Sequence, residues 1–159
     1  FRAIRSHGSI NKKDYKILGV SGRMDTIQSS IILTKLKYLN KSISNRLRIA
    51  KIYDESLNWD FYVKQEIPEK FTHVYHLYPI LLPNKDFREK CLTYLKNKNI
   101  HAQIHYPAIN KMTGFKNYAS NTPISDDVTE RVISIPMFPQ MSEQEIDFVI
   151  QNLNIFSKN

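Results

Sequence analysis

The strongest pattern in the chain is helical and runs from Asp25 to Leu57. Asp25 and Gln28 have the spacing of a capping box, in which each side chain accepts a hydrogen bond from the other residue's backbone N–H. The apolar residues that follow recur at the spacing of one helix face: Ile27, Ile31, Leu36 and Leu39, then Ile43, Leu47, Ala50, Tyr53 and Leu57. Asn40 and Ser42 interrupt this stripe, so we predict two helices in tandem, separated by a kink.

Beyond Leu57 the sequence alternates between strand and helix patterns. The aromatic and β-branched run from Thr72 to Leu82 predicts a strand, and Pro79 implies an edge position or a bulge because proline lacks the ladder N–H. Helical spacing returns from Lys85 to Asn97. Asn99 is suited to the left-handed conformation that ends many helices.

The last third of the chain adds two strand patterns and a helix. Apolar and polar residues alternate from Ile100 to His105, which predicts a half-buried strand. Residues 107–127 show no periodicity and predict a long loop, whereas Val132 to Ile135 predicts a short strand. A second capping box, Ser142 with Glu145, opens the final helix. We therefore predict an α+β fold, in which a small, mainly antiparallel sheet has helices packed on one face.

Length and composition indicate a globular protein. The chain has 159 residues, 42% of them hydrophobic and 24% charged, which is close to globular averages and fits one domain, or a small domain and a piece of another. No apolar run approaches the roughly 18 to 20 residues that a membrane-spanning helix needs, and the N-terminal sequence lacks a signal-peptide layout. We therefore expect a cytoplasmic protein. Because it opens on Phe1 instead of methionine, we also expect a fragment.

The chain is basic, with a formal net charge of +8 and a pI near 9.5. Such an excess of Lys and Arg can bind nucleic acid or another polyanion. Here the basic residues are scattered along predicted helix faces with acidic residues among them. A solvated, Lys-rich surface is the favoured interpretation, and the alternatives are a local site for an anionic substrate and a nucleic-acid patch. We expect neither nucleic acid nor a membrane as a partner.

The histidines and the single cysteine do not predict a metal site. The histidines include two close pairs, His73 with His76 and His101 with His105. On a strand, positions three apart face opposite sides and positions four apart are separated by about 13 Å, whereas zinc ligands must converge at about 2.0 to 2.3 Å from one ion. Cys91 falls on the apolar side of a predicted helix, which indicates a buried, reduced thiol.

One glycine pattern is a candidate for anion binding. The chain contains no P-loop, no G-x-G-x-x-G and no G-x-S-x-G sequence. Gly19 and Gly22 flank Ser21 just before the first helix, an arrangement that can direct backbone N–H groups and a hydroxyl at an anion. By itself this pattern is more typical of a simple turn.

Several stretches match, in order along nearly the whole chain, the pattern of one enzyme family. They are Arg2 to Gly8, Gly19 with Arg23 to Asp25 and Ile27 to Ser30, Lys35-Leu36, Arg46, Ile49-Ala50, Tyr53, Val74 to Tyr78, Ile100 to Pro107 and Ser134 to Pro139. Together they resemble the DegT/DnrJ/EryC1/StrS family of sugar aminotransferases. For the full-length protein the resemblance implies the α/β aspartate-aminotransferase fold of fold type I, with pyridoxal 5′-phosphate as cofactor. It further implies a homodimer that transfers an amino group, usually from glutamate, to a keto-sugar attached to a nucleotide.

The resemblance also divides the chain. Residues 1–23 are implied to be the tail of a large pyridoxal-phosphate-binding domain and a loop that reaches the partner subunit. Residues 24–57 are implied to form a long connecting helix with a kink, and residues 58–159 the C-terminal small domain. In the family, the lysine that carries the cofactor and the acid that holds its ring nitrogen precede the stretch matched by Arg5 to Gly8. We therefore assign no catalytic residue here, and expect the chain alone to bind no cofactor and to be inactive.

Four residues correspond to binding positions of the family. Ser21 stands where the family has an asparagine that reaches the phosphate of the partner subunit's cofactor, and it offers a shorter hydroxyl donor. Arg23 keeps the family's arginine and is expected to pair with a substrate phosphate; the alternative is that it neutralises Asp25 or caps a carbonyl. His105 and Tyr106 match a pair that lies near the nucleotide-sugar, with packing at a strand end as the alternative.

Two departures from the family pattern bear on the substrate. Ala108-Ile109-Asn110 replaces the usual proline-leucine-histidine, and Ile124 to Asp126 covers the place of an acid before the last strand. The leading hypothesis is the C-terminal part of a nucleotide-sugar aminotransferase, either cut from a longer protein or encoded by a truncated gene. The alternative is a stand-alone, non-catalytic module for interaction or dimerisation that derives from this family.

Overall fold

Side-chain caps mark the start of two helices. In the computed structural model the final helix, α5 (Glu143–Phe156), starts with the predicted capping box: the Glu145 amide donates to Ser142 Oγ at 3.2 Å, and the Ser142 amide donates to Glu145 Oε2 at 2.8 Å. The amide of Phe87 donates to Asn84 Oδ1 at 3.0 Å and caps α3, Lys85–Asn97. These bonds satisfy N–H groups that have no partner within the helix.

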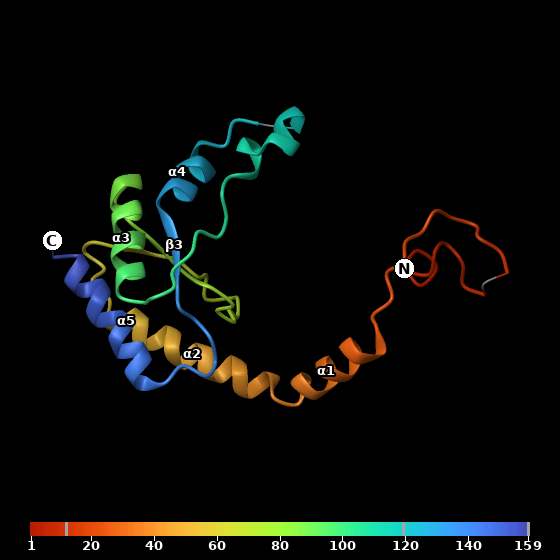
Figure 1. Ribbon diagram of the computed structural model, residues 1–159, viewed down its shortest axis with the longest axis horizontal. Coiled ribbons are helices and arrows are strands. Elements are labelled where there is room, and N and C mark those ends of the chain that lie inside the picture. The colour runs from red at the N-terminus through yellow and green to blue at the C-terminus, as the bar shows by residue number, and fades with distance from the viewer. Residues whose placement is uncertain (12, 119, 159) are drawn as a thin grey trace. The chain divides into compact units, whose positions relative to one another are not determined.

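The structure describes residues 1–11, 13–118 and 120–158. They fall into two compact units, residues 1–40 and 41–159 (Figure 1). Asn99, which follows α3, has a φ of 58° and adopts the predicted left-handed conformation.

The second unit contains a three-stranded antiparallel sheet in the order β1-β2-β3. The strands are β1 (Val63–Lys64), β2 (Tyr78–Leu81) and β3 (Val132–Ile135). Ile80 pairs with Ile133, and both side chains are buried. Together with the helices this sheet confirms the predicted α+β class and the predicted strand at residues 132–135.

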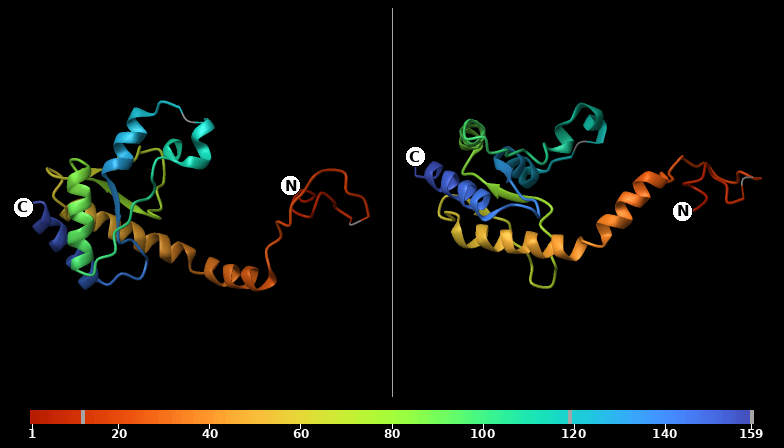
Figure 2. Two further views of the ribbon diagram at one scale, coloured as in Figure 1. Left: turned by 45° about the horizontal axis from the view of Figure 1, so that its top comes forward. Right: turned by 60° about the horizontal axis from the view of Figure 1, so that its bottom comes forward.

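One hydrophobic core joins β2 and β3 to α3, α5 and α2, Leu39–Ser56. The stripe predicted for α2 supplies buried residues on its C-terminal half, and Tyr53 is 0% exposed. The Tyr53 ring packs edge-on against Tyr78 of β2 at 5.1 Å, and its hydroxyl donates to the Pro136 carbonyl at 2.9 Å. Figure 2 shows α2 and α5 side by side in both views. The helices thus fix the ends of β2 and β3.

The first unit contributes one helix, α1 (Thr26–Leu36), which begins at the capping box of Asp25 and Gln28. None of its residues is buried. Two residues, Lys37 and Tyr38, separate α1 from the start of α2, just ahead of the polar interruption at Asn40 and Ser42.

The expected strand at residues 72–82 is shorter than predicted. Residues 72–77 are irregular and the strand begins only at Tyr78. Tyr75 has a φ of 47°, which is incompatible with an extended strand, and its carbonyl accepts a hydrogen bond from Arg46 in place of a neighbouring strand. A long-range contact therefore overrides the local β propensity.

Two further predictions were wrong. The strand expected over residues 100–105 is reduced to one antiparallel bridge, in which Gln103 and Ser134 exchange backbone hydrogen bonds of 3.1 and 2.7 Å. The loop expected over residues 107–127 contains short 3-10 helices at Ile109–Lys111 and Thr113–Tyr118, and then α4, Pro123–Arg131. Proline at the first helical position suits α4, because that N–H has no partner within a helix.

Candidate functional site

The loop ahead of α1 presents Ser21 and Arg23 to solvent. Both residues are exposed, and within the described residues Arg23 forms no ion pair, so it does not neutralise Asp25 as one alternative supposed. A guanidinium in this state has all of its donors available for an anion.

Two glycines hold this loop in place. The backbone of residues 4–7 pairs with residues 20–22 through bonds such as Val20 N to Ile4 O at 2.8 Å. A β-carbon at Gly19 would come within 2.1 Å of the Gly8 nitrogen, and one at Gly8 within 1.7 Å of the Ile17 carbonyl oxygen. Only glycine permits such an approach. Gly8 and Gly19 therefore set the point from which Ser21 and Arg23 project.

In the second unit, His105 and Tyr106 lie side by side after the bridge to β3. Their rings are 5.1 Å apart in an edge-to-face arrangement, and the peptide bond between them is cis. Tyr106 is 67% exposed, whereas His105 Nδ1 is buried and has no hydrogen-bond partner within the described residues. An unpaired buried polar atom costs roughly 1–3 kcal/mol. Simple packing at a strand end leaves this atom unexplained.

Tyr106 stands on the rim of an open pocket of about 440 Å³. The pocket lies between the segment after Tyr106, the 3-10 helix Thr113–Tyr118 and α4. The departure Ala108-Ile109-Asn110 forms part of its lining, as does Ser125 from the second departure. These two departures from the family pattern therefore border the same space.

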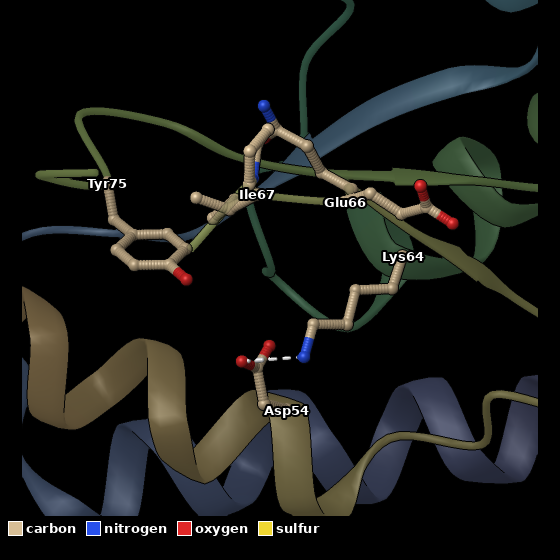
Figure 3. Close-up of a pocket in the computed structure, with 7 residues that line it drawn as sticks. Asp54, Lys64, Glu66, Ile67 and Tyr75 are labelled. Carbon is tan, nitrogen blue, oxygen red and sulfur yellow. Dashed lines mark ion pairs between the residues drawn. The ribbon is translucent and has the colours of Figure 1, made fainter. Parts of the chain in front are cut away.

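A second, larger groove of about 820 Å³ lies beside α2 (Figure 3). Lys64 Nζ reaches the carboxylate of Asp54 at 2.7 Å, and Glu66, Ile67 and Tyr75 form part of the groove's walls. Burial, followed by a hydrogen bond to the Asp54 carboxylate, raises the pKa of Tyr78 far above its usual value. Tyr78 thus stays protonated and uncharged. Two acids, Asp54 and Glu66, line the groove with one lysine, so its charged side chains carry a net negative charge.

Arg46 is a structural centre whose role the sequence patterns did not predict. Its Nη1 donates to the carbonyls of Tyr75, His76 and Met137 at 2.9, 3.0 and 3.0 Å. It thereby joins α2 to the segments that precede β2 and follow β3. Among the patterns considered, only the family resemblance marked this residue.

The ionisable residues restrict the chemistry of the chain by itself. Every lysine that the structure describes is exposed. Cys91 is a free, fully buried thiol, as predicted. Across residues 1–11, 13–118 and 120–158, His, Cys, Asp and Glu form no group of three or more that could hold a metal ion. In the same residues no helix is both long and apolar enough to cross a bilayer.

The fold is that of an aminotransferase. A crystal structure of a DegT/DnrJ/EryC1/StrS aminotransferase from Brucella abortus matches 99% of this chain with a TM-score of 0.90 and 29% identity, and the match covers 43% of that protein. The chain itself belongs to the DegT/DnrJ/EryC1/StrS aminotransferase family, whose sequence profile matches residues 1–154. This membership confirms the predicted resemblance.

The names of two curated relatives describe enzymes that act on nucleotide-linked sugars. The dTDP-3-amino-3,6-dideoxy-alpha-D-galactopyranose transaminase of Aneurinibacillus thermoaerophilus is 31% identical over 95% of this chain and 41% of its own length. The UDP-N-acetyl-3-dehydro-alpha-D-glucosamine 3-aminotransferase of Acidithiobacillus ferrooxidans is 30% identical over 91% of this chain and 39% of its own length. The chain thus spans about two fifths of the length of these relatives.

Proposed function

We propose that this chain supplies the inter-subunit loop, the connecting helices and the small domain of a pyridoxal-phosphate-dependent nucleotide-sugar aminotransferase. Residues 1–23, 24–57 and 58–159 take these roles in order. The reaction moves an amino group from an amino acid, for which we propose glutamate, to a keto-sugar nucleotide. The active form is a homodimer in the cytoplasm, a compartment in which the single thiol of Cys91 stays reduced.

The observation that carries the proposal is the buried Nδ1 of His105, which has no hydrogen-bond partner among the described residues, beside the exposed ring of Tyr106. A polar ligand that covers the tyrosine ring and shifts the imidazole toward it would give the nitrogen a partner. The guanidinium of Arg23, which forms no ion pair with any described residue, offers a planar fork for a substrate phosphate. The exposed Ser21 hydroxyl offers a donor to the cofactor phosphate of the partner subunit. When bound, pyridoxal phosphate supplies the electron sink for moving the amino group.

The chain alone is proposed to be inactive. A lysine that carries the cofactor needs a lowered pKa, which burial or neighbouring charges provide. The exposure of every described lysine offers no such setting, and Lys64, which borders the larger groove, is paired with Asp54. The proposal therefore assigns this chain binding residues and no catalytic residue.

A chimeric enzyme tests the proposal. The matching part of the Aneurinibacillus thermoaerophilus transaminase is replaced by residues 1–159, and amino transfer to its dTDP-linked keto-sugar is measured. We expect activity from the chimera, and a loss of roughly tenfold to a hundredfold in kcat/KM on Arg23→Ala, because a charged hydrogen bond contributes about 1.5–3 kcal/mol.

The matched control for the chimera is Arg48→Ala, which removes an exposed arginine from α2 and is expected to leave kcat/KM unchanged. The chain alone, treated with pyridoxal phosphate and borohydride, is expected to gain no single labelled lysine. A chimera that folds and binds cofactor but transfers no amino group would contradict the proposal.

One observation favours the alternative of a non-catalytic dimerisation module. The apolar stripe of α1 is uncovered, with Ile27, Ile31 and Leu36 exposed by 76%, 52% and 53%. Exposed apolar stripes commonly mark interaction surfaces. A second copy of the chain could cover this one without any catalysis.

A further inference from the structure

The pocket beside Tyr106 is lined by aromatic rings and hydroxyl groups. Phe115 and Tyr118 lie three residues apart in the 3-10 helix Thr113–Tyr118, and positions i and i+3 of such a helix lie on one face. Both rings are accessible, at 49% and 83% exposure. With Tyr106 on the rim, they offer π-faces to whatever enters the pocket.

The hydroxyls come from the opposite wall. Thr122, Ser125 and Thr129 lie at the start of α4 and along it. Ser120 lines the pocket as well. Thr122 and Thr129 donate their hydroxyl protons to Asp126 Oδ1 and to the Asp126 carbonyl, at 3.4 and 3.2 Å, so these two oxygens can accept from a ligand. The serine hydroxyls can both donate and accept, and this mixture suits a ligand with mixed polar edges.

A hydrogen-bond cluster fixes this wall and removes its charge from the pocket. Asn110 Nδ2 donates to Thr122 Oγ1 at 2.7 Å and to Asp126 Oδ1 at 3.2 Å. The other oxygen of Asp126 faces Lys111 Nζ at 3.7 Å. Lys111 Nζ also lies 3.7 Å from Glu130 Oε1, so these charges face one another. No charged side chain is among the described residues that line the pocket.

We propose that this pocket binds the nucleoside part, a base and its sugar, of the nucleotide-sugar substrate. This inference rests on the proposed function, which sets the nucleotide next to Tyr106. A nucleobase is flat and neutral, so its face can stack on the aromatic rings while its polar edge bonds to the hydroxyls on the other wall. Such stacking tolerates different bases. The diphosphate, which needs cations, stays outside a pocket that has none.

The other concave surfaces fit a nucleoside less well. The groove beside α2 carries Asp54 and Glu66, which would repel the attached diphosphate. The groove between α5 and residues 99–101 contains Phe138 and Phe148 but no hydroxyl side chain among its described lining residues. Aromatic faces and hydroxyl groups come together beside Tyr106.

Ligand-observed NMR on the 159-residue chain tests the inference without cofactor or amino donor. The probes are thymidine, dTDP and inorganic pyrophosphate. We expect thymidine and dTDP to compete for one site, and pyrophosphate not to displace thymidine. Phe115→Leu and Tyr118→Leu should each weaken thymidine binding roughly tenfold, since stacking contributes about 1–3 kcal/mol per base.

Two variants serve as controls. Tyr118→Phe keeps the ring and should bind thymidine as the unmodified chain does. Phe148→Leu removes an aromatic residue of nearly equal exposure, 47% against 49% for Phe115, from α5. It should leave thymidine affinity unchanged. Because Tyr118 is 83% exposed, its substitution should leave the fold intact, which circular dichroism checks.

The outcomes separate this inference from the proposed function. Absence of thymidine binding at millimolar concentration overturns the inference, as does binding that Phe115→Leu and Tyr118→Leu leave unchanged. If the chimeric enzyme is active in either of these cases, the proposed function stands while the inference fails. If the chimera is inactive but the pocket variants weaken thymidine binding as expected, the pocket binds nucleosides and the proposed function fails.

Discussion

At the scale of single residues, Cys91 shows how burial controls reactivity. Its side chain is 0% exposed, and desolvation raises the pKa of the thiol to about 12 from a usual value near 9. The thiolate is the reactive form, and this shift lowers its population at pH 8 by roughly a thousandfold. We therefore predict that a disulfide reagent labels the native chain at least a hundredfold more slowly than the chain in 6 M urea. Rapid labelling of the native chain would contradict this.

The same shift predicts a pH dependence of stability. A raised pKa means that the folded state holds the proton of the Cys91 thiol more tightly than the unfolded state does. The contribution of this proton to the free energy of unfolding is therefore complete below about pH 9 and is lost as the pH rises toward 12. Between pH 9 and 10 the free energy of unfolding should fall with a slope approaching 1.4 kcal/mol per pH unit. Cys91→Ala should flatten this slope, and urea titrations at each pH measure it. Buried tyrosines such as Tyr62 add to the loss at higher pH, since burial raises their pKa also.

At the scale of elements, Arg46 connects α2 to the segments that precede β2 and follow β3. Its three hydrogen bonds go to the backbone carbonyls of Tyr75, His76 and Met137. Arg46→Leu should lower the free energy of unfolding by about 3 kcal/mol, because charged hydrogen bonds are lost and carbonyls are left unpaired. Urea denaturation measures the change.

Arg48 is the matched control on the same helix. It forms an exposed ion pair with Glu143, in which the side chains are 42% and 68% exposed. Exposed pairs contribute about 0–1 kcal/mol, so Arg48→Leu should change stability by less than that. Equal effects of the two substitutions would refute the connecting role of Arg46.

Elements with a local signal were predictable from the sequence. α3, α5 and β3 combine apolar spacing with side-chain caps or a β-branched run, and their own residues decide their structure. Residues 72–77 were mispredicted because Arg46, 29 positions before Tyr75, takes the carbonyl of Tyr75. The pocket was not predicted either. Its walls include a 3-10 helix of six residues, and two aromatic residues in so short an element do not form the repeated apolar pattern that marks a helix or strand.

The binding residues were only partly accessible to sequence reasoning. The family resemblance marked Ser21, Arg23, His105 and Tyr106 by position. It could not indicate that Arg23 is free of Asp25, or that His105 Nδ1 is buried without a partner in the described residues. Those properties depend on packing and solvent exposure, which the order of residues does not specify.

At the scale of the whole molecule, the two units differ in how much apolar surface they bury. The second unit has a core with Ile146 and Leu153 of α5 at 0% exposure, whereas α1 in the first unit has no buried residue. A helix of 11 residues is marginal without tertiary contacts. We predict that backbone amides of α1 exchange with deuterium at least a hundredfold faster than those of α5 in dilute solution of the 159-residue chain.

The concentration dependence of this exchange separates the two functional hypotheses. If α1 is uncovered in the isolated chain, as expected for one part of a longer enzyme, its exchange should not change between about 1 and 100 µM protein. If the chain is a dimerisation module, a second copy covers the stripe, and exchange slows with concentration as the bound fraction rises. Ile31→Lys should then abolish that protection without lowering the melting temperature of the second unit, whereas Ile146→Ala should destabilise that unit by about 2–5 kcal/mol. Protection of α1 that rises with concentration and is lost on Ile31→Lys would therefore favour the dimerisation module.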